Sequence, residues 1–244
     1  MSDATVVLAV GVVDALGVAG TSGVCASWCE LETVAPGTGR TFRRLFGRPD
    51  ASFRRLDAVS RALVLAAEAA GLAQSLPEDA RDDTALVFES ALGCLETDLR
   101  FARSLAAGIV EGPLFPYTLP STSLGEVAMR HRLRGPTLCL SVAEEGAALA
   151  EGVRLLDAGE ARFALVGSFE VLREGSAGLA ATLRAVVALI AGAGEDRAAV
   201  APWPRGARAP FTELAAGWRR ARAPLDAPPD PGRAVTTSRD AGAE

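Results

Sequence analysis

The chain has 244 residues, of which 49% are hydrophobic and 23% charged, so it is long enough to bury a substantial core. Its 30 acidic residues outnumber 25 basic ones, and the net charge of -5 argues against nucleic-acid binding, which usually requires a basic domain. All 25 basic residues are arginines, so any mechanism that needs a lysine amine is excluded.

The N-terminal part of the chain predicts a strand, a long loop and a helix. Residues 5–13 (TVVLAVGVV) form a β-branched run typical of a buried strand. Glycines and polar residues from 14 to 49 predict a loop. Behind Asp50 and Ser52, apolar residues recur at helical spacing from 53 to 70, with arginines and Glu68 on the other face. This pattern predicts an amphipathic core helix.

The middle of the chain continues with a strand, a helix and a proline-rich segment. Residues 84–88 (TALVF) predict a strand, and apolar residues from 95 to 109 predict a helix. Residues 112–120 (GPLFPYTLP) predict an extended loop, because each proline removes a backbone donor and restricts the residue before it. Ser123 and Glu126 have the spacing of a capping box, so a helix is expected to begin there.

A strand, helix, strand unit follows. Residues 137–142 (TLCLSV) and 163–167 (FALVG) predict two parallel strands, and the helix between them is expected to begin near Glu145 and to stop at Gly159. The run at 185–191 (AVVALIA) fits a strand or the end of a helix. From Ala223 onward, prolines and small polar residues predict a disordered tail.

Cysteine usage gives no sign of a disulfide framework or a metal site. The four cysteines are Cys25, Cys29, Cys94 and Cys139. Their spacing does not match a zinc motif, and only His131 is available to complete a metal site. We therefore predict no metal and no cofactor.

The N-terminus does not have the pattern of a secretory signal. It contains Asp3 and Asp14, and no basic residue precedes Arg40. No apolar run is long enough to span a bilayer, so the sequence predicts no membrane span and a cytoplasmic location.

Several motifs between residues 115 and 167 occur in a recognisable order. A proline-bearing loop leads into a helix, then the turn Leu133-Arg134-Gly135-Pro136, a strand, a helix, the turn Gly159-Glu160 and a strand that ends in glycine. This order resembles the central segment of β-ketoacyl synthases of the thiolase fold. The resemblance implies an α/β fold, a thiolase-like half with a layered, mixed and mostly parallel sheet, incomplete relative to a full ketosynthase.

The same resemblance implies three segments. Residues 1–195 would form a β-ketoacyl synthase N-terminal-like domain, 196–222 a C-terminal extension and 223–244 a disordered tail. A half of this fold is expected to leave one sheet-and-helix face uncovered. The chain would not reach the C-terminal half of the family, which carries two catalytic histidines, a lysine and a glycine-rich loop.

The nucleophile position departs from the family's pattern. The family's cysteine would fall at position 144, which holds Glu144. The following segment is shorter than in the family, so Val142 stands there in an alternative alignment. Neither side chain supplies the thiolate that attacks in acyl loading. Cys139 lies within the predicted strand and is interpreted as a packing residue.

The sole histidine offers no other catalytic arrangement. His131 lies among Arg130, Arg132 and Arg134, which predicts a solvated basic face rather than a catalytic group. No G-x-S-x-G elbow follows a strand, so a Ser-His-Asp triad is not indicated.

Catalytically empty homologues in this family are chain-length factors, and the chain is similar to truncated examples from aryl-polyene-type pathways. The resemblance implies pairing with a full-length β-ketoacyl synthase, and leaves contact with an acyl carrier protein open. The interface strand would comprise Thr137, Leu138, Cys139, Leu140 and Ser141. The residues approaching the partner's acyl tunnel would be Phe115, Tyr117, Thr118 and Leu119, and the family often has phenylalanine where Thr118 stands.

Three alternatives remain. In the first, the chain is a subunit in which Glu144 decarboxylates malonyl carrier protein to make a primer. This reaction requires oxyanion donors. In the second, the chain is a purely structural scaffold. In the third, which concerns only the 112–120 segment, the aromatic residues fill the chain's own core rather than line a tunnel.

Overall fold

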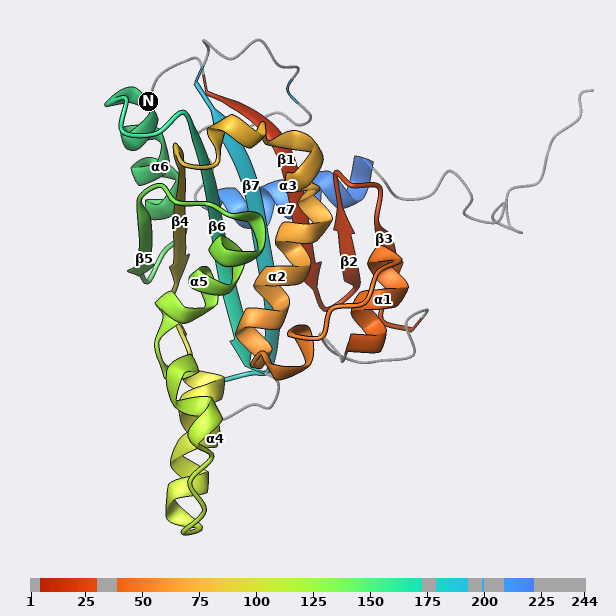
Figure 1. Cartoon of the computed structure of the whole chain (residues 1–244), viewed down its shortest axis with the longest axis vertical. Coiled ribbons are helices and arrows are strands. Elements are labelled where there is room, and N and C mark those ends of the chain that lie inside the picture. The colour runs from red at the N-terminus through yellow and green to blue at the C-terminus, as the bar shows by residue number, and fades with distance from the viewer. Residues whose placement is uncertain (1–4, 30–38, 173–178, 193–198, 200–208, 222–244) are drawn as a thin grey trace, which may run out of the picture.

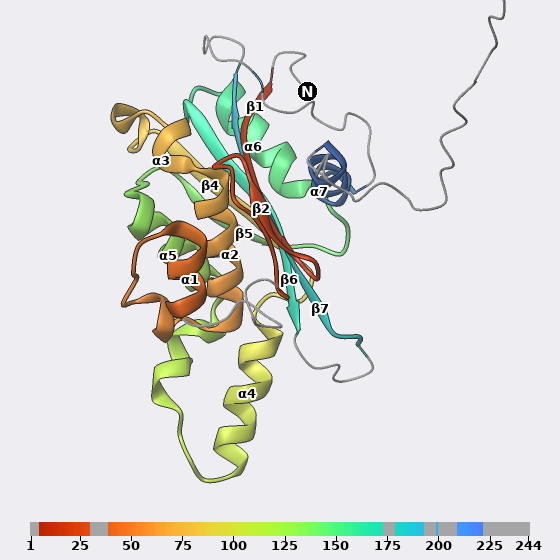
Figure 2. The ribbon, with the colours of Figure 1, turned by 90° about the vertical axis from the view of Figure 1, so that its right-hand side faces the viewer.

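A computed structural model describes residues 5–29, 39–172, 179–192, 199 and 209–221, which form a seven-stranded mixed sheet with helices on both faces (Figures 1 and 2). The strand order is β3-β2-β1-β7-β6-β4-β5. The strands are β1 (Val6–Asp14), β2 (Gly17–Gly20), β3 (Cys25–Ser27), β4 (Thr84–Ser90), β5 (Thr137–Ser141), β6 (Phe163–Leu172) and β7 (Thr182–Ala191).

The sheet is mixed as predicted but not mostly parallel, because only two of the six pairings between described strands, β4–β5 and β4–β6, are parallel. Strands β5 and β6 both pair in parallel with β4, so the predicted parallel relation of these two strands is confirmed, with β4 between them. The ambiguous run at 185–191 belongs to strand β7, which is antiparallel to both β1 and β6. Residues 185–191 are all buried, as expected for a strand covered on both faces.

Helices cover the two faces unequally. The α-helices are α1 (Gly39–Phe46), α2 (Ala58–Ala70), α3 (Leu72–Ser75), α4 (Leu95–Ala106), α5 (Pro120–His131), α6 (Ala147–Asp157) and α7 (Pro210–Ala221). The 3-10 helices are η1 (Phe53–Arg55), η2 (Glu78–Ala80) and η3 (Gly112–Thr118). Figure 2 shows α1, α2 and α5 on one side of the sheet and α6 and α7 on the other.

The long loop predicted for residues 14–49 is wrong, because this segment contains β2, β3 and α1. Of the glycines that suggested a loop, Gly20 is instead required by helix packing, as is Gly11 in the neighbouring strand β1. Helix α2 lies directly on this part of the sheet, and a Cβ at Gly11 or Gly20 would collide with the carbonyl oxygens of Ala66 and Ala69 respectively. Small residues are therefore required in β1 and β2 for close packing.

The predicted amphipathic helix at 53–70 is divided in two. Asp50 accepts hydrogen bonds from the N–H groups of Ser52 and Phe53 at 2.9 Å and so supports only η1. Helix α2 begins later, with the Asp57 carboxylate accepting from the Ser60 N–H at 2.8 Å. Ten residues of α2 are buried, so it is a central helix rather than an amphipathic one.

The extended loop predicted for 112–120 is also wrong. Residues Gly112–Thr118 form η3, in which the fixed φ of Pro113 and Pro116 suits a 3-10 turn. Helix α5 begins at Pro120, three residues before the predicted capping box, because proline is favoured in the first turn. Ser123 instead shares a 2.9 Å hydrogen bond with Ser60, and that pair joins α5 to α2.

The expectation of an uncovered sheet face does not hold. Both faces of the described sheet are covered, and Val10, Val166 and Ile190 on the α6 side are completely buried. Helix α7, which lies in the predicted C-terminal extension, packs on this side. The predicted tail at 223–244 lies outside the described residues. No helix in the described part of the chain is long and apolar enough to cross a membrane.

Candidate functional site

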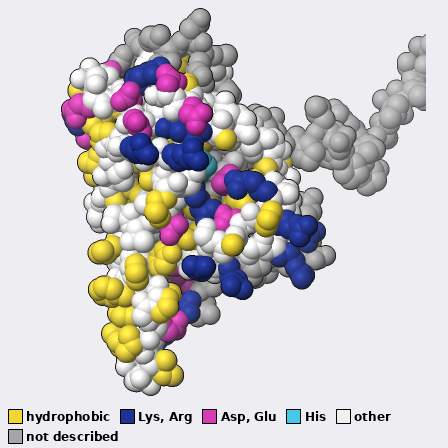
Figure 3. All heavy atoms as spheres, in the orientation of Figure 1, with side chains coloured by type: hydrophobic (Ala, Val, Ile, Leu, Met, Phe, Trp, Pro, Cys, Tyr) yellow, Lys and Arg dark blue, Asp and Glu magenta, His cyan; other side chains and the backbone are white. Residues whose placement is uncertain are grey.

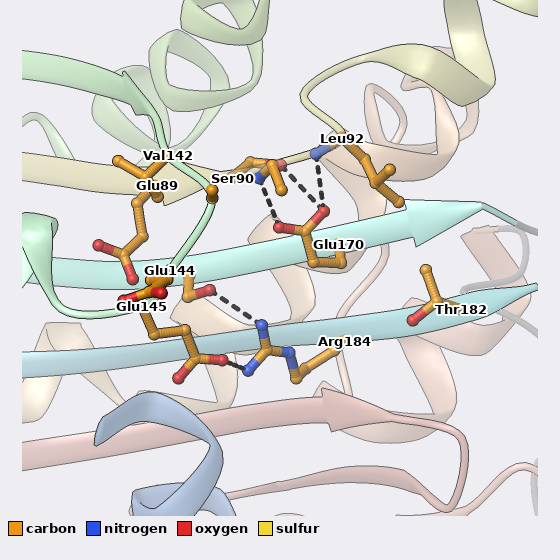
Figure 4. Close-up of a pocket in the computed structure, with 12 residues that line it drawn as sticks. Glu89, Ser90, Leu92, Val142, Glu144, Glu145, Glu170, Thr182 and Arg184 are labelled. Carbon is orange, nitrogen blue, oxygen red and sulfur yellow. Dashed lines mark hydrogen bonds and ion pairs between the residues drawn. The ribbon is translucent and has the colours of Figure 1, made fainter. Parts of the chain in front are cut away.

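An open cavity of about 310 Å³ lies at the carboxyl ends of β4 and β5 (Figure 4). The β5–α6 loop borders it and places the exposed Glu144 and the half-buried Val142 at the cavity, so both candidate nucleophile positions are brought to one place. In the described part of the chain, Glu144 has no hydrogen bond or ion pair. The other ionisable groups of the cavity all have partners.

Glu89 occupies the N-terminus of α6. Its side chain leaves the end of β4 with no exposed surface, and its carboxylate accepts hydrogen bonds from the N–H groups of Gly146 at 2.8 Å and Ala148 at 2.6 Å. A buried carboxylate needs such partners, and the helix dipole favours negative charge there. Two of the N–H groups that follow position 144 are therefore already used.

Glu170 performs the same function for the turn after β4. Its carboxylate accepts from the N–H groups of Ala91 at 2.6 Å and Leu92 at 2.9 Å, and from the Ser90 hydroxyl at 3.3 Å (Figure 4). Stabilising an oxyanion or enolate requires donors that are free to face the developing charge. Four backbone N–H groups around this cavity are instead occupied by the chain's own glutamates.

Strand β5 forms one edge of the sheet, and three of its five N–H groups face away from β4. The Leu86 N–H donates to the Pro136 carbonyl at 2.8 Å, and the Val142 N–H donates to the Ser90 carbonyl at 3.2 Å. Since parallel ladders alternate, the N–H groups of Leu138 and Leu140 also face β4. The remaining N–H groups, those of Thr137, Cys139 and Ser141, point to the free edge.

The predicted interface strand is only partly covered. Thr137 and Ser141 are exposed, and Leu138, Cys139 and Leu140 are half-buried. Burial raises the pKa of the Cys139 thiol to about 11, so it stays protonated at neutral pH, as suits a packing residue. A second cavity of about 220 Å³ joins Cys139 to Pro120 and so links this edge to the segment that follows η3.

The residues predicted to approach a tunnel divide into two groups. Phe115 and Leu119 are 63% and 60% exposed. Tyr117 packs against the main core and donates its hydroxyl to Glu126 at 3.1 Å, an arrangement that favours the core-packing alternative for this residue. The half-buried Thr118 donates its hydroxyl to the Phe115 carbonyl at 2.8 Å.

Helix α4 and η3 form an arm that projects from the body of the molecule (Figure 1). The helix predicted at 95–109 is confirmed as far as Ala106, but its buried residues are Thr97 and Ser104 rather than the apolar ones. Figure 3 shows apolar side chains along the arm and the neighbouring surface. The exposed large apolar residues there are Leu105, Ile109, Val110, Phe115, Leu119 and Met129. Grouped apolar exposure of this kind marks an interaction surface.

The predicted solvated position of His131 is wrong. Its side chain is 9% exposed, and its carbonyl accepts from the Arg81 guanidinium at 3.2 Å. Burial, with smaller effects from Arg130, Arg81 and Arg48, lowers the pKa of His131 to about 4. The histidine is therefore a neutral core residue far from its ordinary titration range.

No motif in the sequence pointed to Glu89 or Glu170, although Glu89 left a signal. It follows four apolar residues in the run TALVFES, and a carboxylate placed at the end of a buried strand must find donors nearby. No comparable pattern marks the exposed face of α4, whose apolar spacing resembles that of any core helix.

No family model matches the sequence, and no curated protein matches it. Solved structures share its fold. The ishigamide ketosynthase/chain length factor is 20% identical over 80% of this chain and 64% of its own, with a TM-score of 0.58. A type II PKS ketosynthase with its acyl-carrier protein (AntDE:AntF) is 13% identical over 78% and 62%, with a TM-score of 0.55. A β-ketoacyl synthase from Burkholderia phymatum is 17% identical over 78% and 59%, with a TM-score of 0.50.

These likenesses confirm the predicted fold class. The chain has the thiolase-like α/β fold of ketosynthases, and it spans 59–64% of the length of these three structures.

Proposed function

We propose that this protein is a non-catalytic, chain-length-factor-like subunit that pairs with a full-length β-ketoacyl synthase and shapes its acyl tunnel. The free edge of β5, beside the exposed apolar arm, is the observation that carries the proposal. The setting would be polyene, polyketide or fatty-acid-type biosynthesis in the cytoplasm, with aryl polyenes as the product class that the sequence resemblance favours.

The properties of β5 support a protein partner at this edge. Natural edge strands are usually protected by charged residues, proline or a bulge, whereas Thr137–Ser141 contains no charge and no proline. Outward N–H groups on such a strand are suited to pairing with a strand of another chain. Solved structures of the same fold, a ketosynthase/chain length factor and a ketosynthase with its acyl-carrier protein, support the choice of a ketosynthase as that partner.

Thiol labelling of the co-expressed pair tests this interface. Cys139 lies on β5, whereas Cys25 and Cys29 are exposed at the opposite end of the sheet. Binding of the synthase is expected to slow maleimide labelling of Cys139 by at least about tenfold and to leave Cys25 and Cys29 unchanged. The rates are read by mass spectrometry of peptides. Equal labelling of Cys139 with and without a bound synthase would exclude β5 from the interface.

The occupied donors around position 144 support the absence of acyl-transfer chemistry. We expect neither the wild type nor a Glu144→Cys variant to be acylated by acyl carrier protein or by a mechanism-based ketosynthase inhibitor, because Glu89 holds the N–H groups of Gly146 and Ala148. Intact mass after incubation is the measurement. A general thiol reagent serves as the control, since it must modify the introduced cysteine. An acyl adduct at position 144 would contradict the proposal.

The decarboxylating alternative has less support. Glu144 is exposed and has no partner among the described residues, and the surrounding donors face other glutamates. Production of acetyl carrier protein from malonyl carrier protein by the isolated chain would restore this alternative.

Thr118 is proposed to set product length through its volume. A Thr118→Phe variant is expected to shorten the product without dissociating the pair, because overpacking at one position costs about 1–3 kcal/mol. Product length is measured by mass spectrometry alongside the elution volume of the complex.

Thr118→Val is the matched control for this prediction. Valine keeps the size of threonine but removes the hydroxyl that donates to the Phe115 carbonyl, so product length should be unchanged. Identical products from an intact Thr118→Phe complex would place Thr118 outside the tunnel.

An arginine patch supports the carrier protein as a further partner. Residues 39–56 contain one acidic residue, Asp50, which is paired with Arg130. The exposed arginines of this segment are Arg40, Arg43, Arg44, Arg48, Arg54 and Arg55, and Figure 3 shows basic side chains gathered over α1 and the segment leading to α2. On a chain of net charge -5, this local charge suits an acidic protein.

Charge reversal tests that contact. Arg43→Glu with Arg54→Glu is expected to weaken carrier-protein binding to the complex by about tenfold at low salt, with the difference fading at high salt. Arg132→Glu, which changes an arginine that is 73% exposed outside the patch, is the matched control. Equal affinities for all three proteins in calorimetry would remove the carrier protein from this subunit.

A further inference from the structure

Helix α7 is held against the sheet by an apolar face. Phe211 is completely buried, and Leu214 and Trp218 are 4% and 6% exposed. They join one core cluster with Val10, Ala188 and α6. Figure 2 shows α7 beside α6 on the side of the sheet opposite α2. A thiolase-like half was expected to leave one face uncovered, and α7 covers this face.

The N-terminus of α7 is fixed by the loop that carries position 144. The Glu145 carboxylate accepts from the N–H groups of Phe211 at 3.1 Å and Thr212 at 3.0 Å, and from the Thr212 hydroxyl at 2.7 Å. Arg184 on β7 pairs with the same carboxylate (Figure 4). It also contacts the Thr212 hydroxyl at 2.5 Å. A carboxylate at a helix N-terminus is stabilising there, and three elements meet at this point.

The other end of α7 is also anchored. Arg219 donates to both carboxylate oxygens of Asp14, at 2.6 and 2.7 Å, and to the Gly17 carbonyl at 3.0 Å. A bidentate pair of this kind fixes orientation as well as position. Helix α7 is therefore attached at both ends to the sheet that it covers.

We propose that Glu145, Arg184 and Thr212 form a latch that locks α7 over the sheet, so that α7 takes the place of a second α/β layer. The β5–α6 loop, where the resemblance to ketosynthases places a nucleophile, serves here as the anchor of a covering helix. A second layer has no access to this face while the latch is closed. The chain then offers partners the β5 side and the arm, and not the face under α7.

Hydrogen exchange of the full-length chain without any partner tests the latch. A Glu145→Ala variant is expected to accelerate amide exchange across α7 by at least about tenfold, while amides of α2 keep their wild-type rates. Glu144→Ala is the matched control, because it removes a neighbouring carboxylate that has no partner in the described structure. Equal α7 rates in Glu145→Ala and Glu144→Ala would overturn the proposal.

Two further variants keep the test decisive if Glu145→Ala does not fold. Thr212→Val removes only the hydroxyl contacts with Glu145 and Arg184, and is expected to accelerate exchange in the first turn of α7 alone. Leu214→Asp is expected to detach α7 and to create binding of an apolar dye by the uncovered sheet. Wild-type exchange in Thr212→Val, or no dye binding by a Leu214→Asp chain with exposed α7 amides, would also overturn it. These outcomes do not depend on whether the protein binds a synthase.

Discussion

A Cys139→Pro variant is expected to fold like the wild type and yet bind the synthase more than about 100-fold more weakly. The Cys139 N–H points to the free edge of β5, as the alternation of the β4–β5 ladder requires. Proline therefore removes no hydrogen bond within the chain, but it removes a donor from the partner and places a ring at the edge. Affinity is measured by titrating the purified variant into the synthase.

Leu138→Pro is the matched control one residue away. The Leu138 N–H faces β4, so proline there breaks a bond inside the sheet and is expected to destabilise the chain by about 3 kcal/mol. Cys139→Ala keeps the outward N–H and should bind normally. If Cys139→Pro bound as tightly as Cys139→Ala, the partner would not pair with this edge, whatever else it contacts.

Lowering the pH from 6.5 to about 4 is expected to reduce the free energy of unfolding by about 3 kcal/mol through His131. Burial holds the pKa of this side chain at about 4 in the folded chain, against 6.5 in the unfolded chain. Between these values the unfolded chain binds a proton that the folded chain does not. The stability is therefore complete above pH 6.5 and is lost as the pH falls. Urea unfolding at several pH values measures it.

A His131→Leu variant isolates this effect. His131 is the only histidine in the chain, and its Nε2 atom has no partner in the structure. The variant should therefore lose the pH dependence between 6.5 and 4.5 at little cost near pH 7. Burial raises the pKa of Asp98, which acts in the opposite direction, but wild type and variant share that effect. An equally steep pH dependence in His131→Leu would assign the effect to carboxylates instead.

The sequence predicts the parts of this fold in which one physical pattern dominates. Strands β1, β4 and β6 come from β-branched or apolar runs, and burial on both faces makes such runs continuous. Strands β2 and β3 are short and lie near glycines that serve helix packing, so their local pattern is that of a loop. The 3-10 helix η3 was missed because prolines exclude an α-helix more strongly than they exclude a 3-10 turn.

The sequence pointed to one position of the candidate site, but not to the hydrogen bonds that surround that position. Motif order alone places Glu144 at the nucleophile position, and the structure puts it at a cavity. The partners of Glu89 and Glu145 lie 39 or more residues away in sequence, so no local pattern contains them. His131 shows the opposite error, because three neighbouring arginines suggest solvent while the tertiary fold buries the ring.

If the proposed synthase covers the arm formed by α4 and η3, the arm also determines how association should respond to temperature. Leu105, Ile109, Val110 and Phe115 are each at least half exposed, and covering them removes apolar surface from water. Such burial lowers the heat capacity of the complex relative to its free components. The enthalpy of association should therefore become steadily more favourable on warming, and the affinity should pass through a maximum and weaken in the cold. A pair held together in this way is best purified at room temperature rather than on ice.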